Sequence, residues 1–202
     1  MSDKIDKIIY INLKKRTDRR QQIEQDLTAY GLPYERFDAI ETPGFGLLGC
    51  GLSHLSVLKL AKEKQYKNVL ILEDDFMFLV SKETLEYQLS QFFDLHLDYD
   101  VCMLSYNLIR FQPTQYTVIN KIIEVQTASG YIVNCKYYDK LINLYEWAMP
   151  ILQETKQESI YSNDQVWKMY QPDDNWYAFN LRIGQQRPGY SDNGGFYVNN
   201  TC

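Results

Sequence analysis

The N-terminal part of the chain combines a continuous apolar run with a segment of helical spacing. Ile5–Leu13 is rich in consecutive apolar residues, which predicts a strand buried on both faces, as in parallel sheets. A helix is expected next, because apolar residues recur at helical spacing from a cap at Thr17 or Asp18 to a stop at Gly31. Leu32–Ile40 has the pattern of a short strand. The opening is therefore β-α-β, which is typical of a parallel sheet.

A second apolar run, Lys67–Phe76, is interrupted near its end by three consecutive acids, Glu73, Asp74 and Asp75. The run predicts another buried strand, and ligands of open α/β sheets gather at the carboxyl ends of such strands. If the chain stays extended there, Glu73 and Asp75 point to one side, where two carboxylates can chelate a hard divalent cation. The alternative is a helix N-terminus, where acids are favourable without any metal.

The rest of the pattern is mixed. The glycine-rich segment Gly44–Gly51 precedes helical spacing through Ala61, and it either lets a nucleotide approach backbone donors or forms a flexible loop. The later expected elements are a helix at 82–93, a strand at 99–104, a hairpin within 106–128 that turns at Asn120-Lys121, a strand at 130–133, and a helix from Tyr137 that Pro150 ends. Because no repeat or linker divides the chain, we expect one α/β domain over residues 1–202, with a mostly parallel central sheet flanked by helices.

Composition narrows the class of protein. With 202 residues, 45% of them hydrophobic, the chain can bury the core of a globular domain. A net charge of −5 with scattered acids predicts no nucleic-acid partner, and no apolar run reaches the ~18 residues of a membrane span. The N-terminus has no signal-peptide pattern and the four cysteines have no metal-binding spacing, so we expect a cytoplasmic protein with reduced thiols.

Several motifs occur in an order that resembles a known family. They are Ile9-Tyr10-Ile11-Asn12-Leu13 with Arg16, Asp18 and Arg19; Phe37-Asp38-Ala39; Gly49-Cys50 with Leu52-Ser53-His54; Leu70-Ile71-Leu72-Glu73-Asp74-Asp75; Thr127-Ala128-Ser129-Gly130-Tyr131-Ile132-Val133; Asp164; and Gln185. Each motif alone is unspecific. Their ordered combination, over nearly the whole chain, resembles glycosyltransferase family 25, which holds bacterial lipopolysaccharide glycosyltransferases and collagen hydroxylysine galactosyltransferases.

The resemblance implies a GT-A fold that binds a nucleotide sugar and uses Mn²⁺ or Mg²⁺. Asp75 is then the first metal ligand and Glu73 the second candidate, while Asp74 contacts the ribose or the sugar. GT-A enzymes often add a ligand near the C-terminus, for which Asp192 is the best-placed acid; its alternative is a turn aspartate before Asn-Gly-Gly. The residues agree with this implication, because a diphosphate beside several carboxylates needs an intervening cation.

Polar residues that follow the first strand are expected at the nucleotide. The expected nucleotide-sugar-binding residues are Asn12, Leu13, Arg16, Asp18, Arg19, Ser53, His54 and Asp74. Arginine suits phosphate, which it binds bidentately, and Ser53 and His54 are expected to shape the same wall. The alternative for the residues after the strand is a solvated helix start capped by Asp18, and for Arg20 this alternative is preferred.

Transfer with inversion requires a general base near the acceptor hydroxyl, and a carboxylate is the usual choice. Asp164 aligns with an acidic position of a later family motif and is the predicted base. The alternative is that Asp164 caps a helix running through Val166, Trp167 and Tyr170. Trp167 and Trp176 suit stacking on a sugar, but tryptophans at such spacing are more typical of a core.

The predicted function is a metal-dependent glycosyltransferase that moves galactose or glucose from a UDP-sugar to a glycan or to hydroxylysine of a collagen-like protein. One alternative is a nucleotide-sugar-binding domain without turnover. Another is a Mg²⁺ phosphohydrolase, which needs an Asp-x-Asp after the first strand, where Ile11-Asn12-Leu13 stands. Collagen-modifying relatives carry a signal peptide, further domain sequence and an ER-retention tail, so we expect a bacterial or viral enzyme, or an excised domain.

Overall fold

The computed structural model describes residues 4–191 and 196–198. Its centre is a six-stranded sheet with the strand order β2-β1-β3-β6-β5-β7. The strands are β1 (Lys7–Asn12), β2 (Glu35–Asp38), β3 (Asn68–Glu73), β5 (Val101–Pro113), β6 (Ile119–Asn134) and β7 (Trp176–Phe179). The pairs β1–β2, β1–β3 and β5–β7 are parallel, and β6 runs antiparallel to both β3 and β5. The predicted mostly parallel sheet is confirmed, with β6 as its reversed strand.

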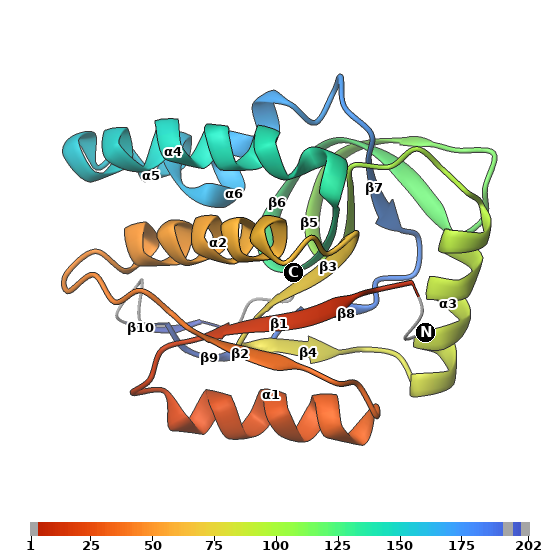
Figure 1. Cartoon of the computed structure of the whole chain (residues 1–202), viewed down its shortest axis with the longest axis horizontal. Helices are drawn as coiled ribbons and strands as arrows, with labels where there is room; N and C mark the ends of the chain where they lie inside the picture. Colours follow the sequence, from red (N-terminus) through yellow and green to blue (C-terminus); the bar gives the residue numbers. More distant parts are fainter. Residues whose placement is uncertain (1–3, 192–195, 199–202) are drawn as a thin grey trace.

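Helices cover both faces of this sheet (Figure 1). One face packs against α2 (Gly46–Glu63) and α4 (Tyr138–Thr155), and the other against α1 (Thr17–Ala29) and α3 (Lys82–Asp94). Alternation along β1 divides the core, because Ile9 and Ile11 belong to the cluster with α2, whereas Ile8 and Tyr10 belong to the cluster with α1. The β-α-β opening and the strands buried on both faces are therefore as predicted.

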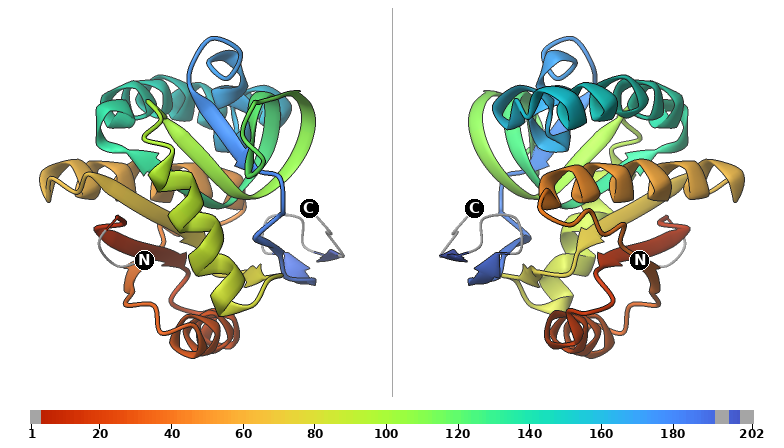
Figure 2. Two further views of the ribbon diagram at one scale, coloured as in Figure 1. Left: turned by 90° about the vertical axis from the view of Figure 1, so that its right-hand side faces the viewer. Right: turned by 90° about the vertical axis from the view of Figure 1, so that its left-hand side faces the viewer.

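Short elements complete the fold. They are β4 (Phe76–Phe78), the 3₁₀ turn η1 (Cys135–Tyr137), α5 (Glu158–Tyr161), α6 (Asn163–Val166), the 3₁₀ turn η2 (Trp167–Met169), β8 (Gly184–Gln186), β9 (Gly189–Ser191) and β10 (Phe196–Val198). β4 pairs with β8 and β9 with β10, so the C-terminal segment returns beside the chain that leaves β3 (Figure 2). Within the described ranges, no helix combines the length and the apolar character that crossing a bilayer requires.

The predicted hairpin is present, but its turn lies earlier in the chain than the predicted position at Asn120-Lys121. β5 continues to Pro113 and β6 begins at Ile119, so Asn120-Lys121 lies within β6 and residues 130–133 belong to the same strand. Polar residues enter this strand because tertiary partners satisfy them: the Lys121 ammonium donates to the backbone carbonyls of Gln171 (3.2 Å) and Asp174. The alternation of residues along a strand gives no information about these tertiary partners.

Two helix boundaries also differ from the expectation. α4 passes through Pro150 and ends at Thr155, because Met149 and Leu152 are buried in the core and their packing offsets the hydrogen bond that proline cannot donate. α2 begins at Gly46, inside the glycine-rich segment, rather than after it. A Cβ on Gly49 would lie 2.4 Å from the carbonyl oxygen of Ile40, so this glycine permits close contact between the helix and the preceding loop.

Gly130→Ala tests the packing that fixes the end of β3. A Cβ at Gly130 would lie 2.6 Å from the fully buried ring of Phe76, the residue directly after the acids. We expect the variant to lose about 1–3 kcal/mol of unfolding free energy through overpacking, measured by urea denaturation. Gly189→Ala is the matched control, because, apart from its two chain neighbours, none of the described residues has an atom within 4 Å of its added Cβ. Equal stability of the two variants would contradict this account of Phe76.

Candidate functional site

A pocket of about 400 Å³ opens at the carboxyl ends of β1 and β3. Residues 39–46, the first turns of α2 and residues 186–191 complete its walls. The predicted site residues in its lining are Leu13, Arg19, Ser53, His54, Glu73, Asp74 and Asp75, whereas Asn12, Arg16, Asp18 and Asp164 are outside the lining. Asp192, the predicted late metal ligand, lies outside the described residues. Most of the predicted set is thus brought together in one place.

The three acids lie at a turn between β3 and β4, which is neither of the two arrangements considered from the sequence. β3 ends at Glu73, Asp74 and Asp75 form the turn, and β4 starts at Phe76. Simple strand alternation therefore does not decide which acids share a side, and no helix begins at the triplet. Each carboxylate instead has its own set of partners.

Asp75 is the acid whose oxygen atoms are least satisfied. Its Oδ2 accepts a hydrogen bond from Arg19 Nη1 (3.1 Å), whereas its buried Oδ1 has no hydrogen-bond partner among the described residues. Burial, followed by the negative charge of Glu73, raises the pKa of Asp75 to about 7 despite Arg19. A buried carboxylate oxygen without a partner, next to other carboxylates, is the donor chemistry that a hard divalent cation takes. The residues present therefore fit Mn²⁺ or Mg²⁺.

Asp74 is fully engaged by protein groups. Its Oδ2 accepts from Asn12 Nδ2 (2.7 Å) and its Oδ1 from Arg19 Nη1 (3.0 Å), and burial raises its pKa overall. Asn12 also donates to the carbonyl of Arg16 (3.1 Å) and accepts from Arg36 Nε (3.0 Å). Asn12 is only 1% exposed. The Asn12–Asp74 pair consequently ties the end of β1 to the end of β3 beneath the pocket.

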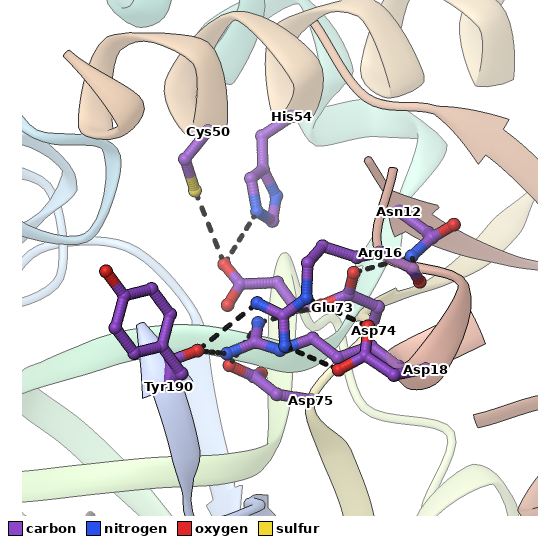
Figure 3. Close-up of polar contacts among 10 residues, drawn as sticks. Asn12, Arg16, Asp18, Cys50, His54, Glu73, Asp74, Asp75 and Tyr190 are labelled. Carbon is purple, nitrogen blue, oxygen red and sulfur yellow. Dashed lines mark hydrogen bonds and ion pairs between the residues drawn. The ribbon is translucent and has the colours of Figure 1, made fainter. Parts of the chain in front are cut away.

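Glu73 is held from the opposite wall by α2. His54 Nε2 lies 3.1 Å and Cys50 Sγ 3.5 Å from the same oxygen, Oε1, and both side chains project from α2 toward it (Figure 3). Burial alone would raise the pKa of Glu73, but the hydrogen bonds from His54 and Cys50 and the charge of Arg19 together outweigh it, so the pKa is lowered. Because a carboxylate only accepts, His54 donates through Nε2, and its Nδ1 accepts from the Tyr131 hydroxyl (2.7 Å).

Two arginines of the α1 start join the pocket to the C-terminal segment. Arg19 Nη2 donates to the carbonyl of Tyr190 (2.8 Å), and Arg16 Nη1 donates to the same oxygen (3.2 Å) (Figure 3). Arg16 also forms a bidentate pair with Asp18 (3.0 and 2.8 Å), which lowers the pKa of Asp18 to about 2. Asp18 is therefore the partner of Arg16 and not a helix cap, since α1 has no side-chain cap hydrogen bond.

Arg20 points away from this group. Its Nε donates to Glu24 (3.0 Å) on the exposed surface of α1, as expected for a solvated helix residue.

Ser53 connects α2 to the loop that forms one pocket wall. Its hydroxyl donates to the carbonyl of Gly49 (2.6 Å) and accepts from the backbone N–H of Ile40 (2.8 Å). The loop is further held by Lys156, whose ammonium lies 3.9 Å from the centroid of the Phe45 ring. The segment around Gly44–Gly51 is thus an ordered wall of the pocket and not a free loop.

Asp164 has a structural role in addition to the predicted catalytic one. Its Oδ2 accepts from the backbone N–H of Thr127 (3.0 Å), and its Oδ1 accepts from the Ser162 hydroxyl (3.1 Å). Thr127 has a φ of 80°, a left-handed conformation that is unfavourable for a β-branched residue and needs such support. Ser162 precedes α6 as its N-cap residue, so Asp164 does not occupy the cap position considered from the sequence.

The two tryptophans considered for sugar stacking are core residues. Trp167 and Trp176 are fully buried, and their rings pack edge to face with centroids 5.0 Å apart. The expectation that they belong to the core is confirmed.

Several pocket contacts are absent from the sequence-based prediction. Cys50 and Tyr131 support the acids through Glu73 and His54, and the carbonyl of Tyr190 binds both arginines. The backbone N–H of Arg187 donates to the carbonyl of Asp75. The C-x₃-H spacing within α2 was the available indication for Cys50, since residues four apart share one helix face. No local pattern indicates a backbone carbonyl such as that of Tyr190.

Part of the amino-acid sequence matches a described protein family and two of its members. The pattern of Glycosyltransferase family 25 (LPS biosynthesis protein) matches residues 44–154, just over half of the chain. A "Glycosyltransferase 25 family member" of Drosophila melanogaster is 33% identical over 101 residues, in an alignment covering 37% of this chain and 16% of the fly protein. The protein of the same description from Drosophila pseudoobscura pseudoobscura is 32% identical with the same coverage. The match therefore spans only a small part of these relatives.

The fold has relatives among solved structures. A glycosyltransferase involved in the glycosylation of the major capsid of PBCV-1 superposes with a TM-score of 0.50 and 11% identity, over 85% of this chain and 80% of that chain. At this identity the likeness concerns the fold, which is the α/β fold of GT-A glycosyltransferases. The family pattern includes the acid triplet and the α2 residues of the pocket, and on that match the chain belongs to glycosyltransferase family 25.

Proposed function

We propose that this protein is a glycosyltransferase that moves galactose or glucose from a UDP-sugar to a glycan or to hydroxylysine of a collagen-like protein, with Mn²⁺ or Mg²⁺. The observation that carries the proposal is the buried Oδ1 of Asp75, which has no partner among the described residues and lies in the pocket beside Arg19. A glycan acceptor has further support, because the family description names lipopolysaccharide biosynthesis. The relatives extend far beyond the matched segment, so their acceptors are not transferred to this chain.

The acids and the arginines are proposed to bind different parts of a sugar nucleotide and its metal ion. Asp75 is the first proposed metal ligand and Glu73 the second, and a divalent cation held there would stabilise the departing diphosphate as a Lewis acid. Arg19 already spans Asp74 and Asp75, so its guanidinium lies where a phosphate would meet the acids. Asp74, fixed by Asn12, is proposed to face the ribose or sugar. Arg16, Asp18, Leu13, Ser53 and His54 are proposed to shape the nucleotide wall.

Asp164 is the proposed base for an inverting transfer. Its neighbour Asn163 lies with Oδ1 3.8 Å from Cys50 Sγ on the α2 wall, which supports a position of Asp164 close to the site. A base must take the proton of the acceptor hydroxyl as the bond to the sugar forms. The hydrogen bonds from Thr127 and Ser162 hold the carboxylate in a fixed orientation, which a positioned base requires.

A panel of nucleotide sugars tests the proposed donor and metal. With Mn²⁺, one UDP-hexose should stabilise the protein by about 2.7 kcal/mol at a ligand concentration 100-fold above its Kd, and it should be hydrolysed slowly. Asp75→Ala should abolish both effects while the fold is retained, because the cation loses its first ligand. Asp98→Ala, an 83% exposed acid paired with Lys136, is the control and should respond like the wild type. Full activity of Asp75→Ala would remove the acid triplet from the site.

Asp164→Asn separates catalysis from folding. We expect donor binding to persist and transfer to an acceptor to fall by ~10²-fold or more, because the amide cannot accept the hydroxyl proton. Ser162→Ala is the matched control: it removes a hydrogen bond that orients Asp164 but keeps the carboxylate. The base assignment is wrong if Asp164→Asn transfers at the wild-type rate, or if Ser162→Ala loses as much transfer with the same fall in melting temperature.

A further inference from the structure

Three side chains of different chemistry converge on the α2 wall of the pocket. They are the thiol of Cys50, the imidazole of His54 and the carboxylate of Glu73, and one donor atom from each lies within 4.8 Å of the other two. Cys50 and His54 lie one turn apart on the same face of α2, and Glu73 faces them from the end of β3 (Figure 3). All three belong to the pocket lining, with His54 fully buried and Cys50 and Glu73 partly exposed.

Two of the three distances within this trio are close to those around a tetrahedral zinc ion, and the third, from Cys50 Sγ to His54 Nε2, is within 4.8 Å. Bonds of about 2.0–2.3 Å from zinc to oxygen, nitrogen and sulfur give ligand-to-ligand separations of roughly 3.3–3.6 Å. The observed separations are 3.1 Å from His54 Nε2 to Glu73 Oε1 and 3.5 Å from Cys50 Sγ to the same oxygen. Small side-chain rotations are therefore enough to place all three donors around one ion.

The surroundings of the trio are also suited to a metal. The Tyr131 hydroxyl binds His54 Nδ1 (2.7 Å), which fixes the ring and leaves Nε2 directed at the site, as second partners of metal-bound histidines do. Cys50 has one thiol proton but faces two acceptors, Glu73 Oε1 and Asn163 Oδ1 (3.8 Å). The amide nitrogen of Asn163, a residue only 3% exposed, has no hydrogen-bond partner among the described residues. The polar groups beside the thiol are thus incompletely satisfied by protein atoms.

We propose that Cys50, His54 and Glu73 form a binding site for a soft or borderline divalent cation, with Zn²⁺ as its natural probe. Thiolate and imidazole ligands select such ions, whereas the carboxylate oxygen of Asp75 suits hard ones. Coordination releases the thiol proton to solvent and requires the other tautomer of His54, in which the ring proton has moved from Nε2 to Nδ1 and is donated to the Tyr131 hydroxyl. A fourth position stays open toward the pocket. Glu73 is a proposed ligand of both ions, so bound Zn²⁺ competes with the hard cation for its carboxylate. This competition rests on the proposed function, whereas the binding of Zn²⁺ does not.

Cobalt spectroscopy tests the site without any measurement of transfer. The background is Cys135→Ser/Cys202→Ser, in which Cys50 and the fully buried Cys102 are the remaining cysteines. One equivalent of Co²⁺ should give a thiolate charge-transfer band in the near ultraviolet, and one equivalent of Zn²⁺ should remove it. Cys50→Ser in the same background should lose the band and keep its melting temperature. Tyr131→Phe should keep the band but bind about 10–100-fold more weakly, because the ring of His54 loses its orienting partner.

Two outcomes overturn the proposal: no thiolate band in the background protein, or an equal band after Cys50→Ser. A Tyr131→Phe variant with unchanged affinity would remove His54 from the ligand set. Failure of the donor panel leaves these spectra unaffected, so the two proposals fail separately.

Discussion

Carboxylate crowding at the carboxyl end of β3 is the constraint on which the rest of the site depends. Glu73, Asp74 and Asp75 lie at consecutive positions in a turn next to the apolar core, where burial and mutual repulsion disfavour three charges together. The fold compensates with donors from every neighbouring element. β1 supplies Asn12, α1 supplies Arg19, and α2 supplies Cys50 and His54. The pocket is the space that these elements enclose.

The compensation is unequal, and this inequality gives the acids different roles. Asp74 has a donor on each oxygen, and Glu73 is held through one oxygen by α2. Asp75 keeps a buried oxygen without a partner in the described structure, and its pKa is the one raised to about 7. Asp75 is therefore the acid whose negative charge is least compensated by protein groups. The same contacts reach the C-terminal segment, since Arg19 also binds the carbonyl of Tyr190.

The sequence predicted five of the six strands of the central sheet, the helices α1 to α4 and seven residues of the pocket lining, because apolar runs and terminal acids are local features. It placed Glu73, Asp75, Arg19 and His54 in one region before any contact was known. The misplaced hairpin turn at Asn120-Lys121 and the helix that passes through Pro150 arise from tertiary packing, which local propensity does not contain.

Contacts between distant segments set the remaining details of the site. Asn12 and Asp74 are separated by 62 positions, and Thr127 and Asp164 by 37. The Asp18 cap was wrong for a local reason instead, because Arg16, two positions away, forms a bidentate ion pair with its carboxylate. The spacing of Cys50 and His54 on α2 is the one local signal for Cys50, whereas its partner Glu73 comes close only through the packing of α2 on β3.

The pH dependence of metal-free stability tests the crowding most directly. A raised pKa means that folded Asp75 holds its proton more tightly than the unfolded chain, so its stabilising contribution is full at low pH and is lost as pH rises through about 7. Between about pH 5 and pH 8, the wild type in chelator should lose about 2–3 kcal/mol of unfolding free energy relative to Asp75→Asn. Denaturant curves that run parallel for the two proteins over this range would contradict the account.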